Sequence, residues 1–132
     1  MKPSYISAGD FFNKRCDVEA IRIHSECVIE TALNLTRDTI LEEDVFIIAG
    51  FLHDIARKES KEVHHLIAVE NLKLFLTEHP VYKKHYEEIR DCLVHHRRFE
   101  NPQTIYAKVF QIAVMLTPYT NRWKEYEKRK HI

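Results

Sequence analysis

Hydrophobic side chains recur at helical spacing along most of this chain. Between residues 17 and 36, apolar or small side chains occur every three or four positions, which predicts an amphipathic helix with one buried face. Residues 41–56 are apolar almost all round and carry the acidic run Glu42 to Asp44 near their start. Their length and this acidic start favour a buried central helix over a strand.

Three further helices are expected downstream. Residues 61–76 carry apolar side chains on one face, which predicts a third helix. Pro80 suits the first turn of a fourth helix, which we expect to run to about Arg97. Thr104 is a good capping residue for a fifth helix that spans residues 105–116.

The composition agrees with a helical protein. A chain of 132 residues suits one domain, which we place over residues 1–132. The chain has only 2 glycines and 4 prolines, fewer than sheets with many tight turns require. Residues 123–132 are rich in charge and predict a solvated or frayed last helix. The sequence therefore predicts an all-α fold, a compact bundle of five to six helices with residues 41–56 at its centre.

Charge and cysteine content narrow the class of protein. The 20 basic and 20 acidic residues cancel, which argues against extended nucleic-acid binding. The longest apolar run, residues 45–52, is too short to cross a membrane, and the first ten residues lack the features of a secretion signal. Three cysteines without a CxxC spacing predict reduced thiols in a cytoplasmic protein. The chain also lacks a glycine-rich phosphate loop.

The candidate chemistry begins at the dipeptide His53-Asp54, which ends the most apolar predicted helix. Burying Asp54 without a partner is costly, so this carboxylate needs a cation, a metal ion or strong hydrogen-bond donors. An exposed helix end is the simpler alternative if the dipeptide is considered by itself.

Other histidines strengthen the case for a metal site. His24 lies on the apolar stripe of the first predicted helix, and His96 shares a face with Ile89 in the fourth. The pair His64 and His65 opens the third helix, so one of the two lies near the core edge. A single inward histidine is more often a hydrogen-bonded core residue than a ligand. Several of them around one carboxylate are typical of sites that bind first-row divalent metals.

Residues of about 18–119 resemble the HD superfamily of metal-dependent phosphohydrolases. The resemblance follows the segments IRIHSECVIETALNL, AGFLHDIARK, HHLIAVENL, IRDCLVHHR and AKVFQIAVML. It implies that His24, His53 and Asp54 bind one divalent metal ion. It further implies that His64 and His96 bind a second ion, with Asp54 as the bridging ligand. Iron, manganese, zinc and magnesium are not distinguished by the sequence.

The choice within each histidine pair rests on different arguments. In the first pair, the helical stripe favours His65, whereas the family spacing favours His64, which we choose. In the second pair, the register of the predicted helix favours His96 over His95.

One position departs from the family pattern. The family has a late Asp within the segment AKVFQIAVML, and Val114 occupies that position here. Gln111 and Thr117 lie one turn to either side, where either side chain is able to hold a water molecule. Arg57 replaces a lysine that is frequent in the family, which keeps the charge and adds a bidentate donor suited to phosphate.

The expected function is therefore a phosphohydrolase for a small phosphate ester or nucleotide, with a metal-activated water as nucleophile. Asp54 and Arg57 are its candidate catalytic residues, and Arg57 and Arg97 its candidate phosphate contacts. Arg97 and Arg98 are adjacent, and the alternative interpretation of this pair is a solvated helix end. The alternatives are an impaired HD-type sensor that keeps a metal or anion pocket, and a structural domain with its histidines satisfied in the core. A homodimer is compatible with all three.

Overall fold

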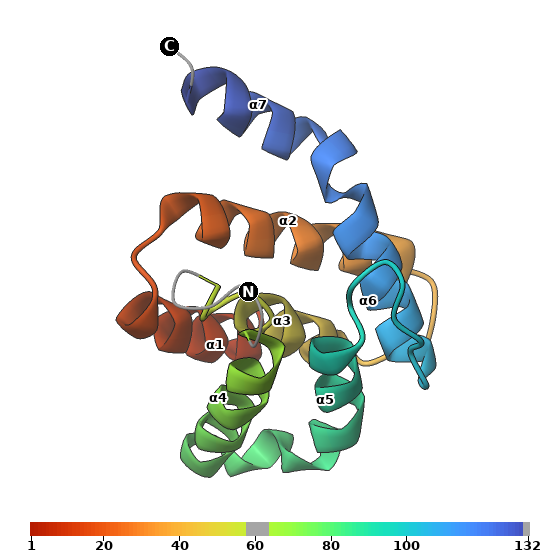
Figure 1. Cartoon of the computed structure of the whole chain (residues 1–132). Coiled ribbons are helices and arrows are strands. Elements are labelled where there is room, and N and C mark those ends of the chain that lie inside the picture. The colour runs from red at the N-terminus through yellow and green to blue at the C-terminus, as the bar shows by residue number, and fades with distance from the viewer. Residues whose placement is uncertain (58–63, 131–132) are drawn as a thin grey trace.

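The computed structural model confirms the predicted all-α fold class (Figure 1). It describes residues 1–57 and 64–130, whereas residues 58–63, residues 131–132 and the side chain of His64 lie outside the described part. In this part of the chain the elements follow in the order α1 (Pro3–Arg15), α2 (Glu19–Leu35), α3 (Glu43–Leu52), α4 (His64–Glu78), η1 (Pro80–His85), α5 (Tyr86–Val94), α6 (Ile105–Leu116), η2 (Thr117–Tyr119) and α7 (Asn121–Lys130).

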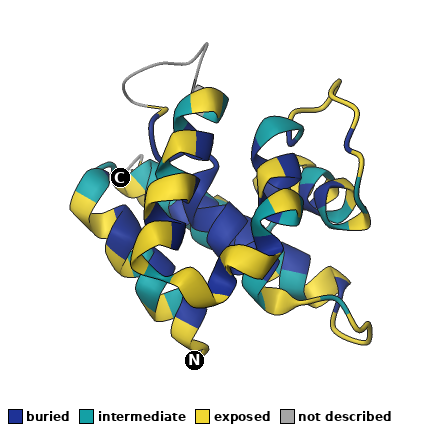
Figure 2. Ribbon diagram, turned by 90° about the horizontal axis from the view of Figure 1, so that it is seen from below, coloured by how far each residue is buried: buried dark blue, intermediate teal, exposed yellow. Residues whose placement is uncertain are grey.

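The helix α3 is the centre of the bundle, as its apolar sequence predicts. All of its residues from Val45 to Leu52 are buried, and Figure 2 shows that burial is concentrated in the middle of the molecule. The helices α1, α2 and α5 pack around α3. The α2–α3 contact is close at Gly50, where a Cβ atom would overlap the side chain of Ile29. This close approach holds the inward face of α2 near the end of α3.

The remaining helices extend this core in two directions. The helices α4 and α5 lie together below α3 in Figure 1, and α6 packs against α2 and α5. After η2 the chain turns into α7, which contacts α2 and then projects away from the bundle at the top of Figure 1. None of the α7 residues is buried. Its Arg122 forms ion pairs with Glu26 at 2.6 Å and Glu30 at 3.4 Å, and these contacts hold its first turn on α2.

The helix α1 is an element that the sequence analysis did not predict. Its buried residues are Ser4, Ala8, Phe11 and Phe12, which lie on one face at helical spacing. The pattern is weak in the sequence because Ser4 is polar and Gly9 is a poor helix former. The structure compensates for the buried serine, since Ser4 donates a hydrogen bond to a carboxylate oxygen of Asp44 in α3.

The predicted fourth helix is divided in the structure. Its first turns form the 3₁₀ helix η1, and α5 ends at Val94 rather than near Arg97. The carboxylate of Asp91 in the last turns of α5 accepts hydrogen bonds from the backbone N–H groups of Gln103 and Thr104, at 2.9 and 2.6 Å. The segment that follows α5 is thereby tied back to the helix. Thr104 caps α6 as predicted, with its hydroxyl accepting from the backbone N–H of Ala107.

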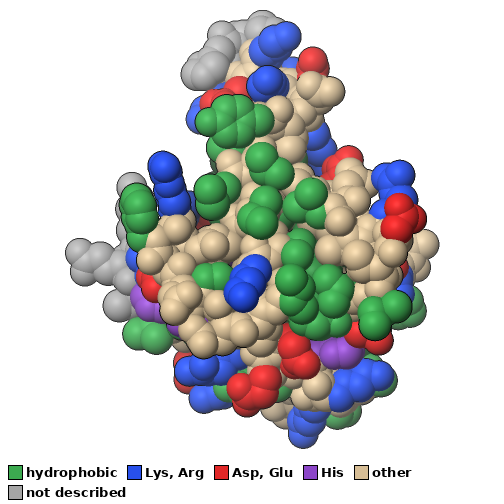
Figure 3. Space-filling model, turned by 90° about the vertical axis from the view of Figure 1, so that its right-hand side faces the viewer, with side chains coloured by type: hydrophobic (Ala, Val, Ile, Leu, Met, Phe, Trp, Pro, Cys, Tyr) green, Lys and Arg blue, Asp and Glu red, His purple; other side chains and the backbone are tan. Residues whose placement is uncertain are grey.

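Hydrophobic side chains also reach the surface on the face formed by α6 and the start of α7 (Figure 3). The exposed members on α6 and η2 are Ile105, Ile112, Met115, Leu116 and Tyr119.

Among residues 1–57 and 64–130, no helix combines the length and the apolar content needed to cross a membrane.

Candidate metal centre

Two histidines are oriented by the ends of the helices that precede them. The Nδ1 atom of His53 lies 2.7 Å from the carbonyl oxygen of Gly50, and that of His96 lies 2.9 Å from the carbonyl oxygen of Leu93. A carbonyl oxygen only accepts, so Nδ1 carries the hydrogen in both rings. Each Nε2 is then left with a lone pair, the form in which imidazole binds a metal ion. The same type of hydrogen bond therefore leaves one potential ligand nitrogen after α3 and another after α5.

His24, His53 and Asp54 form a compact group of potential ligands. The Nε2 atoms of His24 and His53 are 3.2 Å apart, and they lie 3.5 and 3.4 Å from Oδ2 of Asp54. Ligand atoms bound about 2.0–2.2 Å from one metal ion, at tetrahedral or octahedral angles, are separated by about 3.0–3.5 Å. The donor atoms therefore have both the chemistry and the spacing of a shared coordination sphere.

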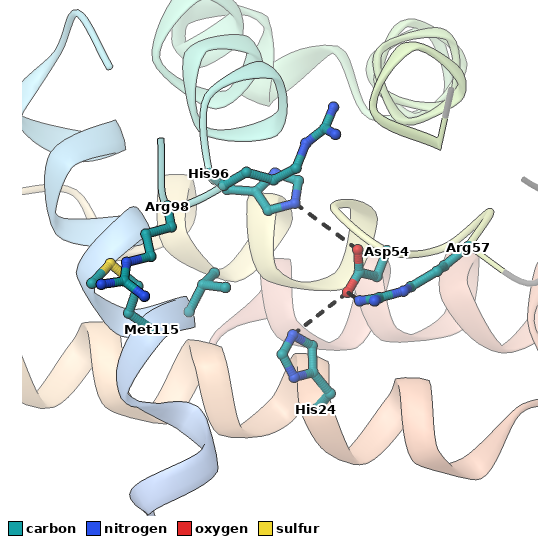
Figure 4. Close-up of a pocket in the computed structure, with 8 residues that line it drawn as sticks. His24, Asp54, Arg57, His96, Arg98 and Met115 are labelled. Atoms are coloured by element: carbon teal, nitrogen blue, oxygen red, sulfur yellow. Dashed lines mark hydrogen bonds and ion pairs between the residues drawn. The ribbon is translucent and has the colours of Figure 1, made fainter. Parts of the chain in front are cut away.

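His96 approaches the same carboxylate from the other side. Its Nε2 atom lies 4.0 Å from Oδ1 of Asp54, and Figure 4 shows Asp54 between the rings of His24 and His96. The ring of His53 is fully buried, with the rings of His96 and Phe110 edge-on against it at 5.1 and 5.3 Å between centroids. Helices α2, α3 and α5 thus converge on one carboxylate.

Burial keeps the imidazoles of this group neutral. It lowers the pKa of His53 to about 3, an effect larger than the opposing attraction of the Asp54 carboxylate. Burial likewise lowers the pKa of His24, with the same carboxylate opposing it. Neutral imidazole is the form that binds metal ions, so protons do not compete strongly for these nitrogens at neutral pH.

The group borders a pocket of about 320 Å³. Its lining residues are His24, Asp54, Arg57, His96, Arg97, Arg98, Val114 and Met115. The guanidinium of Arg57 lies 3.4 Å from Oδ2 of Asp54, and its side chain is about half exposed. His53 lies behind this lining, with its Nε2 atom against Asp54. The pocket therefore combines potential metal ligands and the positive charge of three arginines in one lining.

The two histidine pairs differ in how far the structure shows which member lies near Asp54. His95 turns away from the site, because its Nδ1 atom lies 2.6 Å from Oδ1 of Asp91. His96 is therefore the member of its pair that faces Asp54, as the helical register predicts. The predicted ligand His64 opens α4, but its side chain lies outside the described residues. The Nδ1 atom of His65 accepts a hydrogen bond from Arg97 at 2.8 Å.

Val114, where the sequence resemblance leads one to expect an Asp, lines the pocket. Val114 is partly buried in α6 and lines the cavity together with Met115. The two neighbours that were expected to hold a water molecule have other roles. Gln111 donates to the backbone carbonyl oxygens of Arg97 and Glu100, and the Thr117 hydroxyl donates to the carbonyl oxygen of Ala113 in α6.

Two residues near the site were not singled out from the sequence. Met115 lines the pocket, and the ring of Trp123 lies edge-on to His24 at 6.0 Å between centroids. Arg98, which the sequence analysis named as the neighbour of Arg97 and otherwise expected at a solvated helix end, also lines the pocket. The contact of Trp123 depends on how α7 folds back onto α2, which no local pattern specifies.

No protein-family model, curated protein or solved structure matches this chain. The functional argument consequently rests on the geometry and chemistry of the site.

Proposed function

We propose that this protein is a metal-dependent phosphohydrolase of the HD type that acts on a small phosphate ester or nucleotide. The observation that carries the proposal is the convergence of three imidazoles on the carboxylate of Asp54, at one end of a pocket bordered by arginines. This combination offers ligands for a cation and donors for an anion in the same cavity.

The residues divide into two roles in this proposal. His24, His53 and Asp54 would hold a divalent metal ion, and His96, with His64 by the family resemblance, would serve a second. A bound divalent ion supplies a Lewis acid and a water of lowered pKa. The chain's own contribution to phosphate binding would come from the arginines of the pocket lining. The guanidinium of Arg57 lies 3.4 Å from Oδ2 of Asp54 and would donate to a phosphate oxygen beside that carboxylate.

The donor set fits such an ion better than it fits a purely structural core. A structural histidine needs its polar atoms paired inside the protein, and the Nδ1 atoms of His53 and His96 are so paired. The Nε2 atoms of His53 and His96 lie 3.4 and 4.0 Å from the carboxylate oxygens of Asp54, beside a cavity. Imidazole nitrogens and a carboxylate gathered this closely are the ligand types that a first-row divalent cation prefers.

The test combines metal analysis with an activity screen. Purified protein is assayed for bound transition metals and for hydrolysis of phosphomonoesters and phosphodiesters. The Asp54→Ala variant is expected to lose bound metal and all turnover while keeping a helical circular dichroism spectrum. Asp38→Ala, which changes an exposed carboxylate in the loop after α2, is the matched control and should behave like wild type. Wild-type metal content and turnover in Asp54→Ala would place the site elsewhere.

Val114 favours a second candidate function, that of a ligand-binding or sensor module. An apolar side chain lines the pocket where the family pattern supplies a carboxylate. Loss of one anionic ligand leaves a site with three protein ligands in its first group, which still suffices for zinc. If the protein is a sensor module, the same screen should find bound metal or anion but no turnover of any phosphate ester.

The proposal includes a cytoplasmic location. Cys16, Cys27 and Cys92 are all free and buried, so they behave as small core side chains rather than as parts of disulfides. Reduced thiols of this kind fit a reducing compartment.

A further inference from the structure

Arg98 lies in a turn that several hydrogen bonds hold, on the side of the pocket across from Asp54. The backbone N–H of Glu100 donates to the carbonyl oxygen of Arg97 at 3.0 Å, which closes the turn around Arg98. Gln111 of α6 holds both ends of this turn, since its Nε2 atom donates to the carbonyl oxygens of Arg97 and Glu100 at 2.7 and 3.1 Å. Figure 4 shows the Arg98 side chain beside Met115, across the cavity from Asp54 and Arg57.

The three arginines of the pocket differ in what they contact. Arg57 is paired with Asp54, and Arg97 contacts His65 at 2.8 Å and Glu100 at 3.9 Å. Within residues 1–57 and 64–130, no carboxylate lies within ion-pairing distance of Arg98, whose guanidinium is placed only over the ring of Phe99. The guanidinium of Arg98 is thus the one that a ligand can use without breaking an ion pair with a described residue.

The charge of the lining favours a ligand with several negative charges. The pocket lining has three arginines and one carboxylate, and Glu100 pairs with Arg97 at 3.9 Å, so the described residues leave an excess of positive charge when the imidazoles are neutral. One phosphate group held by Arg57 leaves Arg98 on the other side of the cavity without an anion. A ligand with a second anionic group satisfies both ends at once.

We propose that Arg98 is a specificity-determining residue that binds a second phosphoryl group, so that the preferred ligands are diphosphates or bisphosphates. The proposal rests on the proposed function, in which the first phosphoryl group is held near Asp54 and Arg57. The Val114 and Met115 side chains add apolar surface to the lining of the same pocket. Gln111 acts indirectly, as a positioning residue for the turn that carries Arg98.

The experiment uses the full chain in the presence of a chelator, with orthophosphate and pyrophosphate as probes and NMR titration as the measurement. Wild type is expected to bind pyrophosphate at least about tenfold more tightly than orthophosphate. Arg98→Gln should weaken pyrophosphate binding about tenfold and orthophosphate binding less than about twofold. Gln111→Leu should reproduce part of this loss, because it releases the turn.

Two comparisons separate a specific contact from general attraction. Arg97→Gln removes the same charge from the same lining and should weaken pyrophosphate binding clearly less than Arg98→Gln. Arg90→Gln, an exposed residue of α5 outside this pocket, should have no effect. Equal losses in Arg97→Gln and Arg98→Gln, or equal effects on the two anions, would overturn the proposal. Because the titration is free of metal, its outcome is independent of whether the protein holds a metal ion or turns over an ester.

Discussion

The Nε2 atoms of His24 and His53 lie 3.2 Å apart, although 29 positions separate the two residues in the chain. The contact depends on how closely α2 approaches α3. The two helices come close together at Gly50, where the missing side chain makes room for Ile29 of α2. Gly50 also accepts the hydrogen bond that orients His53. One glycine therefore sets both the distance between the two rings and the tautomer of one of them.

Substitution of Gly50 should consequently affect both the fold and the site. In Gly50→Ala, the new Cβ atom would meet Cγ1 and Cδ1 of Ile29, close to the branch point of a buried side chain. The helices must move apart, which we expect to lower the free energy of unfolding by about 1–3 kcal/mol. Urea denaturation followed by circular dichroism measures this change, and a metal titration should show weaker binding.

Gly9→Ala is the natural control for that experiment, since it changes the other glycine of the chain. Gly9 lies within α1, and a Cβ atom there would meet the Phe51 ring at an ordinary distance of 3.5 Å. Alanine is the better helix former, so this variant should gain about 0.5–1 kcal/mol. Equal losses in both variants would mean that the close approach at Gly50 does not govern the packing.

The same contact shows why the sequence predicts the site only in part. The helical stripes place His24 and His96 on inward faces, and the apolar run places His53-Asp54 at the end of a central helix; each of these is a local pattern. The distances between them depend on the packing between helices. The close approach of α2 at Gly50 is part of that packing, and no periodic pattern in the sequence indicates it.

The missed helix α1 has a similar origin. Its hydrophobic face includes a serine whose burial is acceptable only because Asp44, 40 positions later, accepts its hydrogen bond. The early end of α5 also depends on distant partners, since Asp91 accepts from backbone groups 12 and 13 positions ahead. Local periodicity contains no information about such partners.

Asp91 should make stability depend on pH. Burial raises the pKa of this carboxyl, but the hydrogen bonds from His95, Thr104 and Gln103 outweigh burial, and the net pKa lies below the usual value of 3.8. A group with a lowered pKa in the folded state contributes stability above its unfolded pKa, and this contribution is lost as the pH falls through the folded value. We expect Asp91→Asn to cost about 2 kcal/mol at pH 7.

Denaturation of wild type and Asp91→Asn between pH 7 and pH 2 measures this effect. The difference in unfolding free energy should be constant down to about pH 4 and should shrink below it, because protonated Asp91 resembles Asn. Asp38→Asn is the exposed control. A difference that stays constant to pH 2 would show that the charge of Asp91 is not what holds the turn.

Trp123 offers a direct optical readout of the site. It is the only tryptophan of the chain, and its ring lies 6.0 Å from that of His24. Cobalt(II) or copper(II) bound by His24 should quench its fluorescence in a saturable way, whereas zinc, with its filled d shell, should quench far less at equal occupancy. His24→Ala should abolish the saturable part. Unchanged quenching in that variant would mean that the ion binds elsewhere.

Val114→Asp distinguishes a working enzyme from an impaired one. Val114 lines the pocket with His24, Asp54 and His96, so the variant adds a carboxylate at the edge of the candidate ligand set. Unit charges 4 Å apart attract by about 4 kcal/mol at an effective dielectric constant of 20, and part of this is lost to desolvation. We therefore expect manganese or iron(II) to bind at least about tenfold more tightly, as measured by calorimetric titration.

Ile112→Asp is the matched control, because it adds the same charge to an exposed position of α6 that does not line the pocket. It should leave metal affinity unchanged. The metal-free Val114→Asp protein should melt at a lower temperature than wild type, since its new carboxylate is partly buried, and added metal should reverse that loss. Equal metal affinity in wild type and Val114→Asp would mean that residue 114 does not reach the ion.

Turnover of the metal-loaded Val114→Asp protein then separates the two candidate functions. In an enzyme adapted to fewer protein ligands, the added carboxylate occupies a position that water or substrate needs, so affinity rises while turnover falls. In a module that lost activity with the missing ligand, affinity and turnover rise together. The two readings therefore predict opposite signs for the change in turnover at saturating metal, and a single comparison with wild type decides between them.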